Sequence, residues 1–560
     1  MKSSASSLSS LSSSALSALS SSSLSSSSLS SSSSLILGLA LSLSDGTISS
    51  QSLVTSSLTK ATSTHDGSVL HVVHDPSIEA AVAVDDERKK GTSLPLLAGI
   101  PVSIKDNFNV NGSKTTAGSN MLKDYVSVYD ATVVKALKEN RCIPCFKTNM
   151  DEFGMGSSML NSAFGPCPNP WTKPGNRKST PLTPGGSSGG SASVVSNGIV
   201  PVSIGSDTGG SVRLPASFCG LVGLKPTYGT LSRQGLVSYA SSMDTPGIIT
   251  KSVIDSALVY DSIACYDHDD PTSIETKDKK SATELILGSS TKGKTITPED
   301  ISRMIVRSNG AMSLKHVTVG VPKEFILEEL NDDIRKAWQL SLDMLQDAGA
   351  KVVDVSMPLL RLAVPCYYVL ACAEASSNLS RYDGIRYGFR YKEEDGKHDI
   401  ELGALHKLIA KNRGLGFGPE VIKRILTGSF VLSESAYHQY FGNADRVRHG
   451  IRKEITELFS THGVNMIACP TSPTLPYALN DPPDPCQMLL NDMFTVPANL
   501  TGVPAISIPI NVSYSSQYDT NLPVGIQLIG PSLSESQLFI AALALEQRAE
   551  FYKHTPQWLM

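Results

Sequence analysis

Apolar runs of strand length alternate with helical patterns along most of this chain. Three stretches have the residue spacing of helices, at 130–140, 191–198 and 333–349. Short apolar runs, some of them punctuated by proline, are typical of strands at 141–148, 200–208, 317–322, 351–358, 464–476 and 503–511. Because this alternation is typical of layered α/β proteins, we expect an α/β fold built on a mixed, mostly parallel core β-sheet.

The first 34 residues are of low complexity, and we do not expect them to form part of a core. They contain 23 serines, no acidic residue and a single charged side chain, Lys2. A serine-rich leader without acids is typical of an organellar transit peptide, although transit peptides are normally also rich in arginine. The alternatives are a secretory signal whose apolar region is LILGLALSLS (35–44), a disordered tail, or a misassigned start codon. The 35–44 run is too short to span a bilayer, and we expect no membrane association.

The remainder, 35–560, is expected to fold as one unit that carries a polar, charged surface insertion at about 265–300. A net charge of −4 over 560 residues argues against charge-driven binding of nucleic acid by this chain. The sequence has no G-x-x-x-x-G-K-[ST] phosphate loop, and no G-x-G-x-x-G follows a strand with an acidic residue after it. We therefore expect this chain to bind no cofactor and no metal ion itself.

Three segments contain residues suited to catalysis. GIPVSIKDN (99–107) is an apolar strand that ends in Lys105, and a lysine in that place commonly extends its amine to water. TPGGSSGGS (183–191) contains the nucleophile-elbow pattern G-x-S-x-G twice, centred on Ser187 and Ser188, but read alone it could equally be a linker or a phosphate loop. GSDTGGSVRLPASFCG (205–220) leads from a strand into glycines whose successive N–H groups could converge on an anion, as an oxyanion hole requires.

A serine nucleophile needs a base, and none of the eleven histidines has a compelling catalytic setting. Lysine serves as the base in some serine hydrolases, provided that burial or a cationic neighbour lowers its pKa enough to keep the amine neutral. An apolar strand end inside a fold could provide such burial for Lys105.

Together, GIPVSIKDN, PGGSSGGSA, GSDTGGSVRLPASFCGLVGLKPT and their spacing resemble the amidase signature family. The resemblance runs from about residue 42 to about 552. It implies that the domain at 35–560 has the amidase signature fold, with a central, mixed and mostly parallel twisted β-sheet flanked by α-helices. It also implies a Lys–Ser–Ser triad in which Lys105 is the base, Ser187 the bridging serine with a cis peptide bond, and Ser211 the acylated nucleophile. The N–H groups of Thr208, Gly209, Gly210 and Ser211 would then hold the oxyanion.

Within that family, four further segments resemble the A subunits of glutamyl-tRNA(Gln) amidotransferases; they are found at 149–171, 232–253, 416–433 and 491–509. This resemblance implies a glutaminase whose ammonia converts activated Glu-tRNA(Gln) into Gln-tRNA(Gln). By the same resemblance, Arg424 would bind the α-carboxylate of glutamine and Asp492 its ammonium group.

The same resemblance implies a heterotrimer with B and C subunits. The B partner would use ATP and Mg²⁺ and make most of the contact with the tRNA. We expect a mitochondrial location, with the plastid as the alternative. The rival function is that of a stand-alone amidase of the same family, acting on other carboxamides.

Overall fold

The computed structural model describes residues 34–172, 180–275, 281–288, 297–392 and 404–554. In that part of the chain, eleven strands form a single sheet in the order β1-β3-β2-β4-β6-β5-β10-β11-β9-β7-β8. The strands are β1 (Val69–Val72), β2 (Pro101–Lys105), β3 (Ile143–Thr148), β4 (Val202–Asp207), β5 (Val222–Lys225), β6 (Thr245–Thr250), β7 (Thr318–Pro322), β8 (Lys351–Val355), β9 (Met466–Pro470), β10 (Ala505–Ser515) and β11 (Thr520–Ile529). Every strand that we predicted from the sequence is present.

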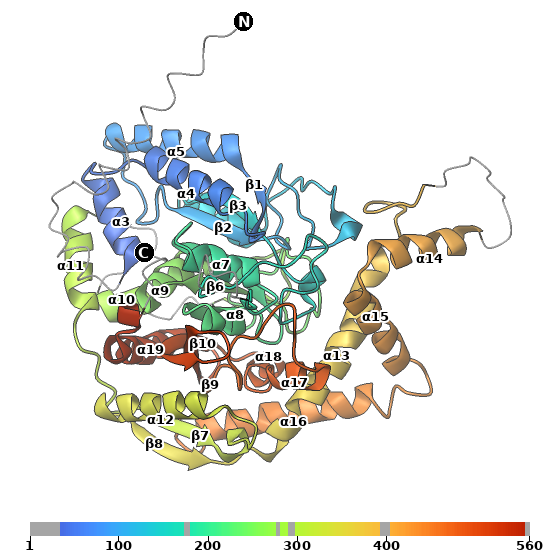
Figure 1. Ribbon diagram of the computed structural model, residues 1–560. Coiled ribbons are helices and arrows are strands. Elements are labelled where there is room, and N and C mark those ends of the chain that lie inside the picture. The colour runs from blue at the N-terminus through green and yellow to red at the C-terminus, as the bar shows by residue number, and fades with distance from the viewer. Residues whose placement is uncertain (1–33, 173–179, 276–280, 289–296, 393–403, 555–560) are drawn as a thin grey trace, which may run out of the picture.

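Helices surround this sheet (Figure 1). The longer helices are α3 (Leu35–Ser44), α4 (Ser50–Thr64), α5 (His74–Lys89), α6 (Thr132–Glu139), α7 (Gly189–Ser196), α9 (Val253–Ile263), α11 (Pro298–Ser308), α12 (Asp332–Asp347), α13 (Ala363–Asn378), α14 (Ala404–Gly416), α15 (Pro419–Val431), α16 (Phe441–Ser460) and α19 (Glu535–Ala549). The short ones are α8 (Arg213–Phe218), α10 (Ala282–Leu287), α17 (Pro485–Leu490) and α18 (Val496–Thr501), together with the single 3₁₀ turns η1 (Asn120–Leu122), η2 (Glu152–Gly154), η3 (Lys323–Phe325), η4 (Pro358–Leu362), η5 (Leu379–Arg381) and η6 (Phe551–His554). The fold is α/β, as predicted.

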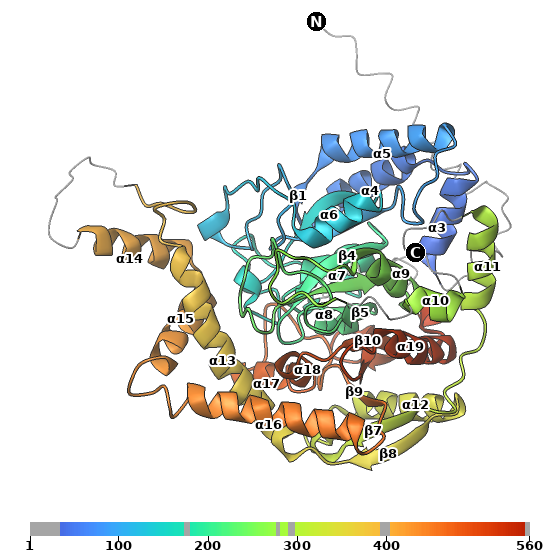
Figure 2. The same ribbon diagram turned by 180° about the vertical axis from the view of Figure 1, so that it is seen from behind.

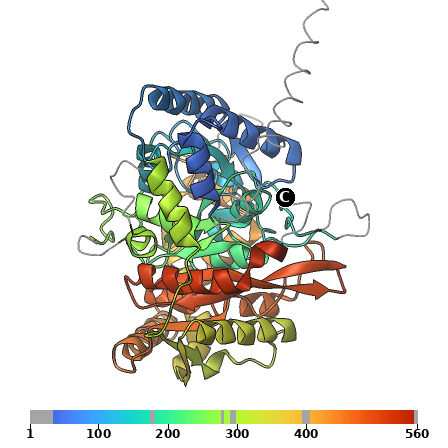
Figure 3. The same cartoon turned by 90° about the vertical axis from the view of Figure 1, so that its left-hand side faces the viewer.

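The sheet is mixed, but the prediction that it is mostly parallel is wrong. The pairs β2–β3, β2–β4, β7–β8 and β7–β9 are parallel, and the other six neighbouring pairs are antiparallel. The β10–β11 hairpin lies in the middle of the strand order, and β6 runs back between β4 and β5. Figure 3 shows this hairpin extending to one side of the body. An apolar run in the sequence indicates a strand but not its direction in the sheet. The sequence alone could therefore not predict how many strand pairs are parallel and how many are antiparallel.

The buried apolar side chains form a larger core and a smaller core. The larger core includes residues of α3, α6, α9, α12 and α19. The smaller core includes residues of α4, α5, α7 and α8. Adjacent residues of β6 show the division, because Ile248 belongs to the larger core and Ile249 to the smaller one, as strand alternation requires.

The apolar segment 35–44 forms helix α3, which is part of the larger core. Ile36 and Leu37 are fully buried. Ser34, which the prediction assigned to the leader, is buried and caps the helix, and its Oγ donates to Asp255 Oδ1 at 2.5 Å. This packing favours a folded role for 35–44 over that of a signal-peptide apolar region. Residues 1–33 lie outside the described residues, so the leader stays a prediction.

The segment 265–300 is not wholly a surface insertion. Its described residues include α10, whose Ile286 and Leu287 are buried and which packs against α9 and α19. Three apolar residues in ATELIL lie on one side of a short helix, and the surrounding charged residues hid this pattern in the sequence. Residues 276–280 and 289–296 of this prediction lie outside the described residues.

Helices α13 to α16 form an arm beside the sheet, and both Figure 1 and Figure 2 show α14 and α15 extending away from the body. Within the arm, α13 packs along α15 and α16. The stretch Pro358–Arg381, which contains α13, is long and apolar enough to cross a membrane by length and composition alone. Half of it is buried within the protein, and a buried core helix passes the same test.

Candidate active site

Lys105 is fully buried at the end of β2, where the sheet positions it next to two serines. Its Nζ lies 2.7 Å from Ser187 Oγ and 2.9 Å from Ser206 Oγ. Parallel pairing of β2 with β3 and β4 places this strand end inside the fold. The amine therefore does not extend to water, and the predicted contact between Lys105 and Ser187 is present.

Burial also changes the acidity of this lysine. It lowers the pKa of Lys105 to about 7, although the carboxylates of Asp151, Asp207 and Asp244 act in the opposite direction. An amine with this pKa is neutral in a large fraction of molecules near pH 7, whereas an ordinary lysine is almost entirely protonated. Lys105 can therefore accept a proton at neutral pH.

The stretch 183–191 is a buried turn and not a linker. It enters α7, and the peptide bond between Gly186 and Ser187 is cis. Gly186 packs against the Asp151 carboxylate so closely that a β-carbon there would collide with it. The Asp151 N–H in turn donates to the Ser187 carbonyl at 3.3 Å. These contacts set the position from which Ser187 meets Lys105.

Ser211 lies in the turn between β4 and α8 and is partly exposed. Its carbonyl accepts a hydrogen bond from the Ser188 N–H at 3.1 Å, which joins this turn to the stretch that carries Ser187. The structure thus brings Lys105, Ser187 and the Ser211 turn into one site. Of the three side chains, Ser211 is the one with access to a substrate.

The predicted oxyanion hole needs one correction. The Gly210 N–H donates to Asp207 Oδ1 at 2.9 Å, so it is not available to a ligand. Among the described residues, the N–H groups of Thr208, Gly209 and Ser211 have no such protein acceptor. The sequence could not show that a carboxylate three residues earlier would take one of the four predicted donors. The remaining three can still converge on an anion.

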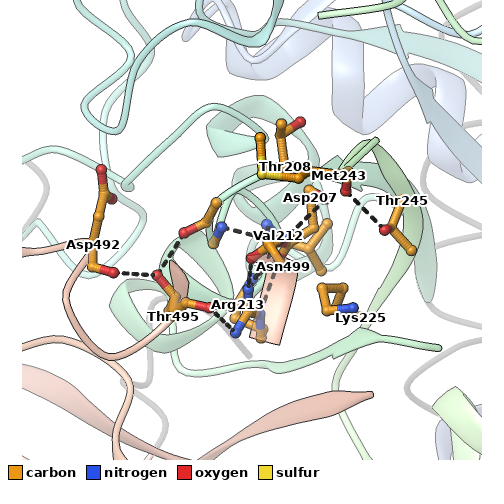
Figure 4. Close-up of polar contacts among 12 residues, drawn as sticks. Asp207, Thr208, Val212, Arg213, Lys225, Met243, Thr245, Asp492, Thr495 and Asn499 are labelled. Atoms are coloured by element: carbon orange, nitrogen blue, oxygen red, sulfur yellow. Dashed lines mark hydrogen bonds and ion pairs between the residues drawn. The ribbon is translucent and has the colours of Figure 1, made fainter. Parts of the chain in front are cut away.

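Asp207 and Arg213 form a buried clamp around this turn that the sequence analysis missed (Figure 4). Arg213 Nη2 lies 2.9 Å from Asp207 Oδ1, and Arg213 Nε lies 3.0 Å from Oδ2. Asn499 donates to the same carboxylate at 2.9 Å. Burial alone would raise the pKa of Asp207, but the Arg213 guanidinium outweighs it and holds that pKa well below its usual range. Both residues lie within GSDTGGSVRLPASFCG (205–220), where an acidic and a basic side chain six positions apart could have indicated an ion pair.

Replacing Arg213 with methionine is expected to destabilise the protein strongly. The change would leave the Asp207 carboxylate buried without its cation, which typically costs about 3–5 kcal/mol. Arg303→Met is the control, since Arg303 pairs with Asp300 at 3.5 Å on the surface, where such pairs contribute about 0–1 kcal/mol. The midpoint of urea unfolding should fall clearly for the first variant and hardly for the second. Equal midpoints would contradict the clamp.

Arg424 of α15 and Asp492 lie in one cluster with tyrosines from other elements. Arg424 Nη1 donates to Tyr239 OH at 2.5 Å, and the guanidinium lies 5.3 Å from the centre of the Tyr368 ring. Tyr368 OH donates to Asp492 Oδ2 at 2.8 Å. Burial raises the pKa of Asp492 to about 6, so the carboxylate is mostly ionised above that pH. A cation and an anion therefore both contact Tyr368, the guanidinium over its ring and the carboxylate at its hydroxyl.

Two contacts connect this cluster to the Ser211 turn. Thr495 Oγ1 donates to the Gly209 carbonyl at 2.6 Å, and the Thr495 N–H donates to the Asp492 carbonyl at 3.2 Å. On the other side, a β-carbon at Gly209 would lie 2.6 Å from Tyr367 Cζ, so only glycine allows the ring this close. Thr495 and Tyr239 lie within segments quoted for the resemblance. Tyr367 and Tyr368, on the apolar helix α13, gave no signal in the sequence.

Fold and site together have the features of an α/β serine hydrolase whose base is a buried lysine. The chain belongs to the Amidase family, whose sequence pattern matches residues 52–539.

Its relatives include proteins named as the A subunit of glutamyl-tRNA(Gln) amidotransferase. The one from Novosphingobium aromaticivorans is 40% identical over 486 residues, which cover 86% of this chain and 90% of the relative. The one from Fusobacterium nucleatum subsp. nucleatum is 42% identical over 474 residues, which cover 85% of this chain and 88% of the relative.

Solved structures show the same likeness. The crystal structure of the Thermotoga maritima protein of that name has a TM-score of 0.68 and 35% identity, covering 91% of this chain and 94% of that one. A peptide amidase from Stenotrophomonas maltophilia has a TM-score of 0.71 at 24% identity, with 92% and 96% covered, and so shares the fold.

Proposed function

We propose that this chain is the glutamine-hydrolysing A subunit of a glutamyl-tRNA(Gln) amidotransferase. The observation that carries the proposal is the Arg424–Asp492 cluster beside the Lys105–Ser187–Ser211 site. Glutamine has an α-carboxylate and an α-ammonium group next to each other, and a guanidinium and a carboxylate are their natural partners. Relatives about 40% identical over most of the chain carry the same name.

The proposed reaction uses the three catalytic candidates in turn. Neutral Lys105 accepts the Ser211 proton through the Ser187 hydroxyl, and Ser211 Oγ attacks the side-chain carbonyl carbon of glutamine. The N–H groups of Thr208, Gly209 and Ser211 would bind the resulting oxyanion, where one such donor typically contributes about 3–4 kcal/mol. The C–N bond then breaks, and the lysine proton leaves with the nitrogen as ammonia. Water attacks the glutamyl ester, releases glutamate and restores the Ser211 hydroxyl.

Ammonia forms an amide only with an activated carboxyl group, so the proposed function requires partner subunits that supply one. They are the B and C subunits of a heterotrimer, of which B would use ATP and Mg²⁺ to activate Glu-tRNA(Gln) and would make most of the tRNA contact. The serine-rich leader supports a mitochondrial location, with a plastid as the alternative. The near-neutral charge of this chain supports leaving the tRNA to the partner.

Glutamine hydrolysis is expected to rise with pH through about 7 and then level off. Lys105 has a lowered pKa and can act as a base only when deprotonated, so activity is lost as the pH falls below that value. Asp492, whose pKa is raised to about 6, must be ionised to bind the ammonium group of glutamine. Its protonation therefore also lowers activity as the pH falls. The profile of kcat/KM between pH 5 and 9 measures this. A value of kcat/KM that still increases steadily up to pH 9, as a base with an ordinary lysine pKa requires, would contradict the mechanism.

The function is tested by co-expressing the chain with candidate B and C subunits and measuring glutamate release. We expect co-purification and glutamine hydrolysis coupled to Gln-tRNA(Gln) formation. Rapid hydrolysis of an aryl or fatty amide, with no response to glutamine in the assembled complex, would instead support the stand-alone amidase. Imaging a fusion of residues 1–60 to a reporter tests the location separately.

A further inference from the structure

Glu152 is a buried carboxylate that contacts two distant parts of the chain. It follows β3, within η2, and is only 2% exposed. Ser119 Oγ, from the segment before η1, donates to Glu152 Oε1. The Gly418 N–H, at the start of α15, donates to Oε2 at 2.8 Å. Burial raises the pKa of Glu152 to about 7, which these two donors partly oppose.

Glu152 supplies the cap that α15 lacks. The N-cap residue of this helix is Gly418, which has no side chain to satisfy the first backbone donors. A carboxylate at this end is also favoured by the helix dipole. The approach is so close that a β-carbon on Gly418 would collide with Glu152 Oε2. Beside it, the rings of Phe153 and Phe417 lie 5.6 Å apart, so the start of α15 is held by two adjacent contacts.

The first turn of α15 is in turn fixed to Arg424. Glu420 Oε1 accepts a hydrogen bond from Arg424 Nε at 2.7 Å, within the same helix. Arg424 is the sixth residue after Gly418, which corresponds to a helical rise of about 9 Å. A shift of the capped end therefore moves the guanidinium relative to the rest of the site.

The segment that carries Glu152 also contacts the serine site. Asp151 packs against Gly186, and a β-carbon at Gly154 would lie 3.7 Å from Ser187 Oγ. One short stretch of chain thus contacts both the serine that meets Lys105 and the helix that carries Arg424.

We infer that Glu152 is a positioning residue for glutamine, which caps α15 and thereby sets the place of Arg424 relative to Ser187 and Ser211. The identity of the ligand rests on the function proposed above. Glu152 itself has no hydrogen bond to Arg424, Ser187 or Ser211, so its effect must act through the helix. The expected consequence is on substrate recognition rather than on the chemical steps.

The test is Glu152→Gln in the assembled complex, with Glu546→Gln as a matched control. Glu546 is partly exposed as a residue, but its Oε2 is buried and its Oε1 accepts the Val253 N–H at 2.9 Å at the start of α9. At pH 8, where most of the Glu152 carboxylate is ionised, Glu152→Gln should raise the KM for glutamine about tenfold, with kcat changed much less, because it weakens one charge-assisted cap. Glu546→Gln should leave the KM unchanged.

A substrate without the α-carboxylate separates positioning from general damage. For 4-aminobutanamide, wild type and Glu152→Gln should have nearly equal kcat/KM, since Arg424 has no carboxylate to bind. Equal losses with both substrates, or no loss with glutamine, would overturn the inference. If Glu152→Gln does not fold, Gly418→Ala disturbs the same contact from the other side and should give the same pattern.

Amide hydrogen exchange gives a result that does not depend on the substrate. Glu152→Gln should speed amide exchange in the first turn of α15 and leave α9 unchanged. Glu546→Gln should speed exchange in the first turn of α9 and leave α15 unchanged. If wild type fails to hydrolyse glutamine, the proposed function fails, and the exchange data still decide whether Glu152 caps α15. Unchanged exchange in α15 would overturn the inference.

Discussion

Ser211→Ala is expected to abolish glutamine-dependent amidation while the complex still assembles. The side chain is partly exposed in a turn that is held by the Asp207–Arg213 clamp, so its loss removes the nucleophile without disturbing the core. Loss of a serine nucleophile costs roughly 10⁴- to 10⁶-fold in comparable hydrolases. Glutamate release and Gln-tRNA(Gln) formation from glutamine measure the effect.

Added ammonium is the control for this variant. It bypasses glutamine hydrolysis and should restore Gln-tRNA(Gln) formation in the Ser211→Ala complex, because activation would take place in the partner. If ammonium fails to restore the product, Ser211 has a structural role and the assignment of the nucleophile is wrong.

Lys105→Ala is expected to reduce glutamine hydrolysis by a similar factor, since Ser187 and Ser211 would then have no base. Lys105→Arg distinguishes a base from a mere positive charge, because arginine stays protonated in proteins. We expect both variants to be inactive on glutamine and to be rescued by ammonium. Glutamine hydrolysis by Lys105→Arg near the wild-type rate would show that the residue acts through its charge.

The sequence was sufficient to predict the α/β class and the contact between Lys105 and Ser187. Lys105 was recognisable because a lysine that ends an apolar strand has either to reach water or to remain buried, and the serine-rich turns offered a reason for burial. Arg424 and Asp492 came from the resemblance to a family, since each alone reads as an ordinary surface charge. Their contact through Tyr368 joins residues 124 and 56 positions apart along the chain, which no local pattern encodes.

Other features depended on tertiary contacts that the sequence does not display. The occupied N–H of Gly210 follows from the direction in which the Asp207 side chain turns after β4. The antiparallel pairs of the sheet follow from where β6 and the β10–β11 hairpin are inserted. The burial of α3 follows from Asp255, far along the chain, which satisfies the start of that helix.

The central claim is that Ser211, and not either serine at the centre of G-x-S-x-G in TPGGSSGGS, carries the acyl group. Acid quenching of the assembled complex during glutamine turnover, followed by peptide mass spectrometry, tests it most directly. We predict a glutamyl ester on the peptide that contains Ser211, absent from Ser211→Ala. A glutamyl ester on Ser187 or Ser188 would contradict the account.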